Sequence, residues 1–212
     1  MRIKDFVDSI SMEHSTFGSG PVTALSGVLG AALFSMCINR AVLRTDNLEL
    51  TGSLERLGQK VRMLKELLLQ TADEEKQVLK DLENALDMAN KTKEEKVQRY
   101  HILAGVHKRT VSLSLGTAET CCGLLRLIPE LQVEDDQHSS FNIGVAAVTI
   151  RGGFDGAILN TKRRVKNAED EDFRRNAYQK IQLLNNKMND FYSKINPLEK
   201  TGTPEELNSL KI

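Results

Sequence analysis

Apolar residues recur at helical spacing along most of this chain. From Leu54 onward they follow one another mainly three or four residues apart, and this stripe consists of Leu54, Leu57, Val61, Leu64, Leu68, Ala72, Leu79, Leu82, Leu86 and Ala89. Such spacing places all members on one face of a long helix. The stripe has one polar step, at Glu75.

The same spacing predicts a second long helix between Thr92 and Pro129. Its apolar stripe consists of Val97, Tyr100, Ala104, Val111, Leu115, Ala118, Cys122, Leu125 and Ile128, with His107 on the same face. Thr92 and Glu95 have the spacing of a capping box, which favours a helix start there. Pro129 ends the pattern, because proline does not continue a helix.

Three further helices are expected. An apolar run covers residues 22–38, a Gly/Ala-rich segment covers about 142–163, and an amphipathic segment covers about 170–195. The polar and acidic stretch 131–139 is predicted to be a connecting loop. Strands are not expected, because β-branched residues do not alternate with polar ones over a useful length.

These elements predict the fold class. A length of 212 residues is enough for one domain with a full hydrophobic core. Long helices joined by short connections fold most simply as antiparallel neighbours. We therefore expect an all-α protein, an antiparallel up-and-down bundle of about five long helices over residues 1–195, followed by a polar C-terminal tail over 196–212.

Composition narrows the classes of partner. Lys plus Arg number 29 and Asp plus Glu also number 29, so no net field favours nucleic acid or an anionic membrane surface. The apolar run 22–38 is shorter than the roughly 20 residues of a membrane span, and we interpret it as a buried core helix. Three cysteines and the absence of a secretory signal pattern indicate reduced packing cysteines and a cytoplasmic location.

A glycine-rich segment precedes the first apolar helix. It reads Phe17-Gly18-Ser19-Gly20-Pro21, and we call it the glycine loop. Glycines allow a tight turn, and proline suits the first position of a helix. The free amides of such a helix start can hold a carboxylate, a phosphate or a developing oxyanion. A plain turn is the alternative interpretation of the glycine loop.

Small residues also gather inside two of the expected helices. Gly27 and Gly30 lie in the helix after the glycine loop, and Gly153 and Gly156 lie in the later Gly/Ala-rich helix. Small side chains let two helix backbones approach closely. The two helices are therefore expected to touch each other or their symmetry mates in a dimer.

Two blocks of residues resemble a known family. The glycine loop and the small-residue helix over 24–33 resemble the family's Pro-Gly-Gly-Gly-Ser and the helix after it, with two of three glycines kept. The second block consists of Val145-Ala146-Ala147, Gly153, Gly156-Ala157 and Asn160, which is similar to the family's Val-Ala-Ala, Gly, Gly-Ala and Asn. Three further matches are partial. Asp73 matches only the first residue of the family's Asp-Ala-x-Ala-Phe. Leu113-Ser114-Leu115 resembles the family's Val-Pro-Leu, and Ala118-Glu119 resembles its Ala-Glu. The chain thus resembles the cyclodeaminase domain of formimidoyltransferase-cyclodeaminase and its stand-alone relatives, the methenyltetrahydrofolate cyclohydrolases.

The resemblance implies a dimeric helical bundle that binds a small-molecule folate near the glycine loop. The implied reaction is cyclisation of 5-formimidoyltetrahydrofolate with loss of ammonia, or hydrolysis of the 5,10-methenyl ring, with the tetrahydrofolate derivative as substrate and no covalently bound cofactor. Either reaction needs a proton donor and acceptor near the one-carbon unit. The implied folate-binding residues are Gly18, Ser19, Gly20, Asn142 and Asn160.

The sequence departs from the family pattern at two places. The family's Ser-Asp before the Val-Ala-Ala block reads Phe141-Asn142 here, and an amide does not exchange protons near neutral pH. Asn142 is then either a hydrogen-bonding group for a pterin or a helix cap. The family's later Ile-Asn is replaced by Arg163-Arg164. These arginines either bind the glutamate tail of a folate or are the ordinary cations of a helix end.

Three residues are candidates for proton transfer: Glu75, Asp73 and His107. The position of Glu75 on an apolar stripe indicates partial burial. Burial implies either a raised pKa of the carboxyl, which is useful for catalysis, or a basic partner from another helix. Asp73 matches the family position, but the neighbouring acids equally indicate a solvated face. His107 is either a core histidine or a second acid/base group. No histidines have the spacing of zinc ligands, so no metal site is expected.

Two functions follow from these residues. The first is a one-carbon folate enzyme, a cyclodeaminase or a cyclohydrolase. The second is a catalytically impaired folate-binding or scaffold protein of the same fold, since the family aspartate is replaced by Asn142. The resemblance depends most on small residues, which determine how helices pack. It therefore supports a shared fold more strongly than a shared activity.

Overall fold

A computed structural model of the chain describes residues 3–12, 18–131, 137–166 and 168–195. Within these residues every regular element is helical: α1 (Ile3–Ile10), α2 (Ser19–Arg44), α3 (Leu48–Asp87), α4 (Lys93–Leu127), the short 3₁₀ turn η1 (Ile128–Glu130), α5 (Gln137–Lys166) and α6 (Glu171–Ile195). The all-α prediction is confirmed for the described part of the chain. The predicted tail over 196–212 lies outside the described residues.

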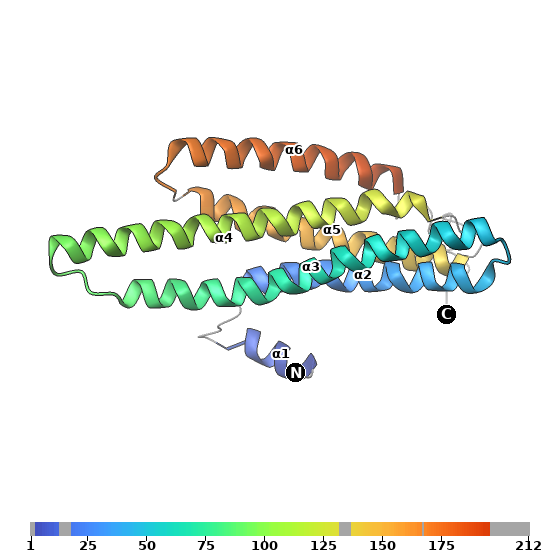
Figure 1. Cartoon of the computed structure of the whole chain (residues 1–212), viewed down its shortest axis with the longest axis horizontal. Coiled ribbons are helices and arrows are strands. Elements are labelled where there is room, and N and C mark those ends of the chain that lie inside the picture. Colours follow the sequence, from blue (N-terminus) through green and yellow to red (C-terminus); the bar gives the residue numbers. More distant parts are fainter. Residues whose placement is uncertain (1–2, 13–17, 132–136, 167, 196–212) are drawn as a thin grey trace, which may run out of the picture.

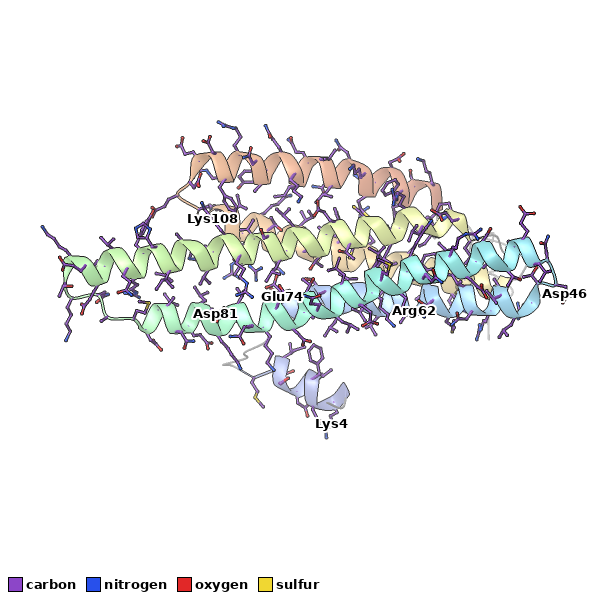
Figure 2. All side chains as sticks on the ribbon, in the orientation of Figure 1. Lys4, Asp46, Arg62, Glu74, Asp81 and Lys108 are labelled. Atoms are coloured by element: carbon purple, nitrogen blue, oxygen red, sulfur yellow. The ribbon has the colours of Figure 1, made fainter. Side chains whose placement is uncertain are left out.

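Four of the long helices form an antiparallel up-and-down bundle (Figure 1). Helix α2 packs between α3 and α5, and α4 closes the bundle against α3 and α5. Helix α6 lies along α4 and α5 on the outside of this group. The end of α3 and the start of α4 run beyond α2 as a two-helix hairpin (Figure 1). Charged side chains such as those of Asp46, Arg62 and Lys108 cover the periphery (Figure 2).

Side-chain caps explain where two of these helices begin. Asn47 Oδ1 accepts hydrogen bonds from the amides of Glu49 and Leu50 at the start of α3. Thr92 and Glu95 form the predicted capping box at the start of α4. Each cap satisfies backbone donors that have no partner inside the helix.

Helix α5 begins earlier than its pattern indicates. We expected a loop over 131–139, but the chain is helical from Gln137. No glycine or proline lies between Gln137 and Phe141, so nothing in that stretch interrupts a helix once it has started. Asn142 consequently lies within the first turns of α5 and not at its N-cap, so the interpretation of Asn142 as a helix cap was wrong.

The apolar stripe of α3 is confirmed in its first half and shifts in its second half. Leu54, Leu57, Val61, Leu68 and Ala72 are buried. Beyond Glu75 the buried positions are Val78 and Ala85, whereas Leu86 of the expected stripe is 51% exposed. A straight helix with 3.6 residues per turn drifts away from a seven-residue repeat, so the face that meets the neighbouring helix changes along its length.

The small residues of α2 and α5 bring these two helices into close contact. A Cβ atom built at Gly153 would lie 2.9 Å from the amide nitrogen of Gly27 and from the carbonyl oxygen of Thr23. One built at Gly30 would lie 2.9 Å from the carbonyl oxygen of Ala146. The predicted close approach of backbones therefore occurs within the subunit.

Within the described residues, two helical segments are long and apolar enough to cross a membrane. They are Ser19–Arg44 and Lys93–Glu130, and their most apolar windows are 50% and 67% buried inside the bundle. Core helices of a globular bundle can have the same length and hydropathy. Burial of these windows supports the interpretation of α2 as a core helix.

Candidate functional site

The carboxylate of Glu75 lies inside the bundle beside the start of α2. Its side chain is 1% exposed. A Cβ atom at Gly20 would overlap Oε2 of Glu75, so only glycine lets the first turn of α2 come this close. The helix start carries partial positive charge, which favours a carboxylate there. Gly20 therefore makes room for an acidic side chain of the protein itself.

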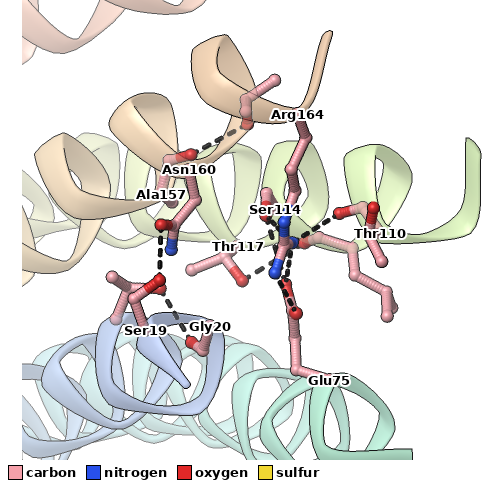
Figure 3. Close-up of polar contacts among 12 residues, drawn as sticks. Ser19, Gly20, Glu75, Thr110, Ser114, Thr117, Ala157, Asn160 and Arg164 are labelled. Atoms are coloured by element: carbon pink, nitrogen blue, oxygen red, sulfur yellow. Dashed lines mark hydrogen bonds and ion pairs between the residues drawn. The ribbon is translucent and has the colours of Figure 1, made fainter. Parts of the chain in front are cut away.

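Arg164 of α5 forms a two-pronged ion pair with Glu75 (Figure 3). Nη1 donates to Oε1 at 2.9 Å, and Nη2 donates to Oε2 at 2.9 Å. Nη1 also lies 2.8 Å from the carbonyl oxygen of Thr110 and 2.6 Å from Oγ of Ser114. Ser114 Oγ in turn donates to Oε1 of Glu75 at 3.1 Å. The sequence left open whether Glu75 has a basic partner from another helix, and the structure supplies one.

Asn160 lies one helical turn before Arg164 and faces the start of α2. The hydroxyl of Ser19 donates to Oδ1 of Asn160 at 2.6 Å. Nδ2 of Asn160 is buried and has no hydrogen-bond partner among the described residues. A buried donor without a partner costs free energy, so this amide is suited to a hydrogen-bond acceptor on a ligand.

A cleft of about 420 Å³ opens on the other side of Arg164, between α4, the end of α5 and the start of α6. It is lined by Tyr100, His101, Leu103, Ala104, His107, Lys108, Val111, Arg164, Ala168, Glu169, Asp170 and Phe173. The volume is within the usual range of small-molecule sites. Arg164 thus joins the buried carboxylate of Glu75 to a cavity that a ligand can enter.

Two polar contacts connect α4 to the segment before α6 at this cleft. The Tyr100 hydroxyl donates to Oε2 of Glu169 at 2.7 Å, and Lys108 Nζ lies 2.8 Å from Oδ2 of Asp170. The hydrogen bond from Lys108, with another from the amide of Phe173, lowers the pKa of Asp170. The charges of Lys108 and Asp170 therefore compensate each other.

The structure brings some of the predicted site residues together and separates others. Gly18, Ser19, Gly20, Asn160, Glu75 and Arg164 gather around the start of α2, and His107 lines the cleft. Asp73 and Arg163 are exposed. Asn142 lies 18 residues before Asn160 on α5, about 27 Å along the helix axis, so it is remote from Glu75.

Sequence reasoning missed Ser114 and Thr110. Both are buried and supply oxygen atoms to the guanidinium of Arg164. The polar Ser114 between Leu113 and Leu115 was a signal for the hydroxyl contact. Thr110 supplies its backbone carbonyl oxygen, which no side-chain pattern indicates.

The described residues offer neither a metal site nor a reactive thiol. Among the described residues, no group of three or more His, Cys, Asp or Glu side chains is placed to hold a metal ion. Cys121 and Cys122 are buried, and burial raises the pKa of the Cys122 thiol to about 12 and that of Cys121 further. Neither is a thiolate nucleophile near neutral pH.

Comparison with known proteins identifies the family. Residues 2–183 match the family model described as formiminotransferase-cyclodeaminase. The chain belongs to this family. The resemblance inferred from the glycine loop and the second small-residue block is therefore confirmed.

Members of the formiminotransferase-cyclodeaminase family resemble this chain at modest identity. A methenyltetrahydrofolate cyclohydrolase of Methylorubrum extorquens is 24% identical over 171 residues, which cover 81% of this chain and 82% of that protein. A formimidoyltransferase-cyclodeaminase of Sus scrofa is 25% identical over 182 residues, which cover 86% of this chain and only 34% of the longer relative.

The fold is shared with a solved member of the family. The crystal structure of formiminotetrahydrofolate cyclodeaminase from Thermotoga maritima superposes with a TM-score of 0.69 at 18% identity, over 94% of this chain and 96% of that one. At this identity the similarity establishes the common fold. The activity of this chain has to be argued from its own site.

Proposed function

We propose that this chain is a one-carbon folate enzyme, acting as a formimidoyltetrahydrofolate cyclodeaminase or a methenyltetrahydrofolate cyclohydrolase. Family membership supports the substrate class. The structural observation that carries the proposal is the fully buried carboxylate of Glu75, held at the glycine start of α2 in a network shared by four helices.

Each residue of the network has a role in this proposal. The unpartnered Nδ2 of Asn160 and the start of α2 bind acceptor atoms of the folate. Glu75 exchanges a proton at the one-carbon unit, and His107 is a second acid/base group on the cleft side of Arg164. Oε1 of Glu75 accepts hydrogen bonds from Arg164 and Ser114, whereas Oε2 accepts only from Arg164 among the described residues, so Oε2 keeps a lone pair for a proton.

The alternative is a catalytically impaired folate-binding or scaffold protein of the same fold. Two observations favour it: the two-pronged pairing of Glu75 with Arg164, and Asn142 in place of the family's acid. In this case the network is structural and the folate, if bound, is not converted.

Two measurements on the purified chain distinguish these functions. Spectrophotometric turnover of 5,10-methenyltetrahydrofolate and calorimetric titration with 5-formyltetrahydrofolate are compared for wild type, Glu75→Gln and Glu83→Gln. Glu83 is an exposed acid on the same helix and is the matched control. Turnover above the rate in buffer that falls for Glu75→Gln alone supports the enzyme. Binding without turnover supports the folate-binding form of the alternative, and neither binding nor turnover contradicts the enzyme and leaves only the scaffold form.

We also propose that the chain forms a homodimer. Large apolar side chains are exposed on the neighbouring helices α2 and α5, at Val22, Leu29, Leu43, Phe141, Val145, Val148 and Leu159. Large apolar surface that is exposed on neighbouring helices often marks a site of interaction with another protein. An isologous contact between two copies would cover it.

A further inference from the structure

The exposed apolar face of α2 and α5 borders directly on the site at the start of α2. Ser19 and Asn160 are joined there by a hydrogen bond (Figure 3). Val22 follows Ser19 by one helical turn and is 39% exposed, and Leu159 directly precedes Asn160 and is 67% exposed. A partner that covers this face therefore also covers the edge of the site, where Nδ2 of Asn160 has no hydrogen-bond partner among the described residues.

The sequence at the two ends of α5 carries opposite charges. Its C-terminal end has three exposed cations that pair with no acid of the described residues, Lys162, Arg163 and Lys166. Three acids directly precede the helix in the sequence, Glu134-Asp135-Asp136. A parallel contact between two copies would bring like charges together at each end, whereas an antiparallel contact brings opposite charges together.

The middle of the same face carries small residues. A Cβ atom built at the exposed Gly152 would meet only Oγ of Ser26 within 4 Å, at 3.8 Å. Large exposed apolar side chains lie on both sides of this position along α5, at Phe141, Val145 and Val148 before it and at Leu159 after it. The charge of Asp155 is compensated by Arg151 of the same helix. Small residues let two helices approach closely, so a two-fold axis near Gly152 gives an antiparallel contact with large side chains packed at both ends.

Asn142 takes the position related to Asn160 by such an axis. The two residues are 18 positions apart on α5, which is about five full turns, so both side chains leave the helix on the same side. Their midpoint lies next to Gly152, so an antiparallel partner places its Asn142 opposite Asn160. The side chain of Asn142 is half-buried and has no hydrogen-bond partner within the described part of the chain. Its amide is therefore available to a ligand.

We propose that two copies pair antiparallel through α2 and α5, and that the partner's Asn142 completes the site formed by Ser19 and Asn160. The composite site then offers two amide groups, one from each copy, whose N–H donors are not used by described residues of their own chains. The ligand of the composite site is the folate of the proposed function, so this part of the inference rests on that function. The antiparallel pairing rests only on the proposed homodimer.

Engineered disulfides test the antiparallel pairing. Val145 and Leu159 are 14 residues apart on α5, about 21 Å along the helix axis, so thiols at these two positions cannot bridge within one chain. In the antiparallel pair, Val145 of one copy lies opposite Leu159 of the other. The three native cysteines are buried and do not compete for the introduced thiols.

Val145→Cys/Leu159→Cys should give a covalent dimer on a non-reducing gel after mild oxidation, whereas Val145→Cys and Leu159→Cys alone should not. The control is Met63→Cys/Leu159→Cys, which pairs one position of the face with an exposed position of α3 and should give no covalent dimer. A covalent dimer of either single variant shows a parallel contact and overturns the proposal. Absence of a covalent dimer in the double variant overturns it as well.

Mixed dimers test the composite site. Calorimetric titration with 5-formyltetrahydrofolate is compared for Asn142→Ala, Asn160→Ala and the control Asn176→Ala on the exposed face of α6. The first two variants should bind roughly tenfold more weakly than wild type or worse, and the control should not. An equal mixture of Asn142→Ala and Asn160→Ala, after exchange of subunits, should regain wild-type affinity at about one quarter of the sites. Half of the dimers are then mixed, and each mixed dimer has one intact site.

The outcomes separate this inference from the proposed function. Folate binding by wild type without recovery in the mixture shows that Asn142 does not act in the partner's site, and it overturns the composite site while the proposed function stands. A wild type that binds no folate contradicts the proposed function and the composite site together, whereas the disulfide result still decides the antiparallel pairing. A covalent dimer of Val145→Cys/Leu159→Cys and recovery in the mixture support both parts.

Discussion

Glu75 and Arg164 show how a single residue pair organises the centre of the bundle. Their side chains are 1% and 17% exposed, and hydrogen bonds from Ser114 and to Thr110 complete the network. Removing charges from water is costly, so such a pair is stable only when both partners are present. The network is therefore sensitive to single substitutions.

We predict that the two partners depend on each other for stability. Glu75→Leu and Arg164→Met should each lower the free energy of unfolding by about 3–5 kcal/mol, because each leaves one buried charge unpaired. The double variant Glu75→Leu/Arg164→Met should lose clearly less than the sum. Urea unfolding followed by circular dichroism measures this.

The exposed pair Lys194–Asp190 provides the control for this cycle. Its side chains are 60% and 55% exposed, so Asp190→Asn should change the unfolding free energy by about 0.5 kcal/mol or less. Losses at Glu75 as small as that of the control, or strictly additive losses in the double variant, would contradict a buried, coupled pair.

The cysteines should be inert in the folded chain. Burial holds the pKa of Cys122 at about 12 and that of Cys121 above it, so the reactive thiolate forms only in alkali. At pH 8 we expect a thiol reagent to modify neither residue without denaturant and all three cysteines in 8 M urea. Rapid labelling of Cys121 or Cys122 in the folded chain would refute the burial.

At the scale of elements, the contact between α2 and α5 depends on the absence of side chains. Gly153 lies against the backbone of α2, and a backbone cannot move aside as a flexible side chain does. Gly116 on α4 has nothing within 4 Å of an added Cβ. The two glycines are thus a matched pair: an added methyl group meets the backbone of another helix at Gly153 and open space at Gly116.

We predict opposite effects of alanine at these positions. Gly153→Ala should destabilise by about 1–3 kcal/mol, because the added methyl forces the two helices apart. Gly116→Ala should stabilise by about 0.5–1 kcal/mol, because alanine is the better helix former. Thermal unfolding compares them, and a melting temperature of Gly153→Ala at or above that of wild type would show that α2 and α5 are not in close contact.

At the scale of the whole molecule, the proposed homodimer depends on the exposed apolar residues of α2 and α5, which a second copy would cover. Leu29 and Leu159 are 66% and 67% exposed. Exposure of this size on adjacent helices is unfavourable in water unless a partner covers it.

Sedimentation analysis tests the dimer. Wild type should sediment as a dimer at micromolar concentration, and Leu29→Lys/Leu159→Lys should sediment as a monomer because lysine at the contact is costly to bury. Met63→Lys/Leu67→Lys on exposed positions of α3 is the matched control and should remain dimeric. A monomeric wild type excludes the homodimer.

The sequence by itself determined the long helices, apart from the start of α5, and the family. Periodicity is a local property of the chain, so the apolar stripe, the capping box at Thr92 and the two small-residue blocks are readable from neighbouring residues. Burial of Glu75 was also predictable, since its neighbours on that face are apolar positions of the same stripe.

Only the tertiary structure decided what the site residues do. Arg164 and Glu75 stand 89 positions apart, and Gly20 approaches Glu75 from a third helix, so their pairing follows from the register of packed helices and not from any local pattern. The same reason explains why Asn142, which shares α5 with Asn160, is remote from the carboxylate. A register between helices is the sum of many packing contacts along their whole length, and no short stretch of sequence contains that sum.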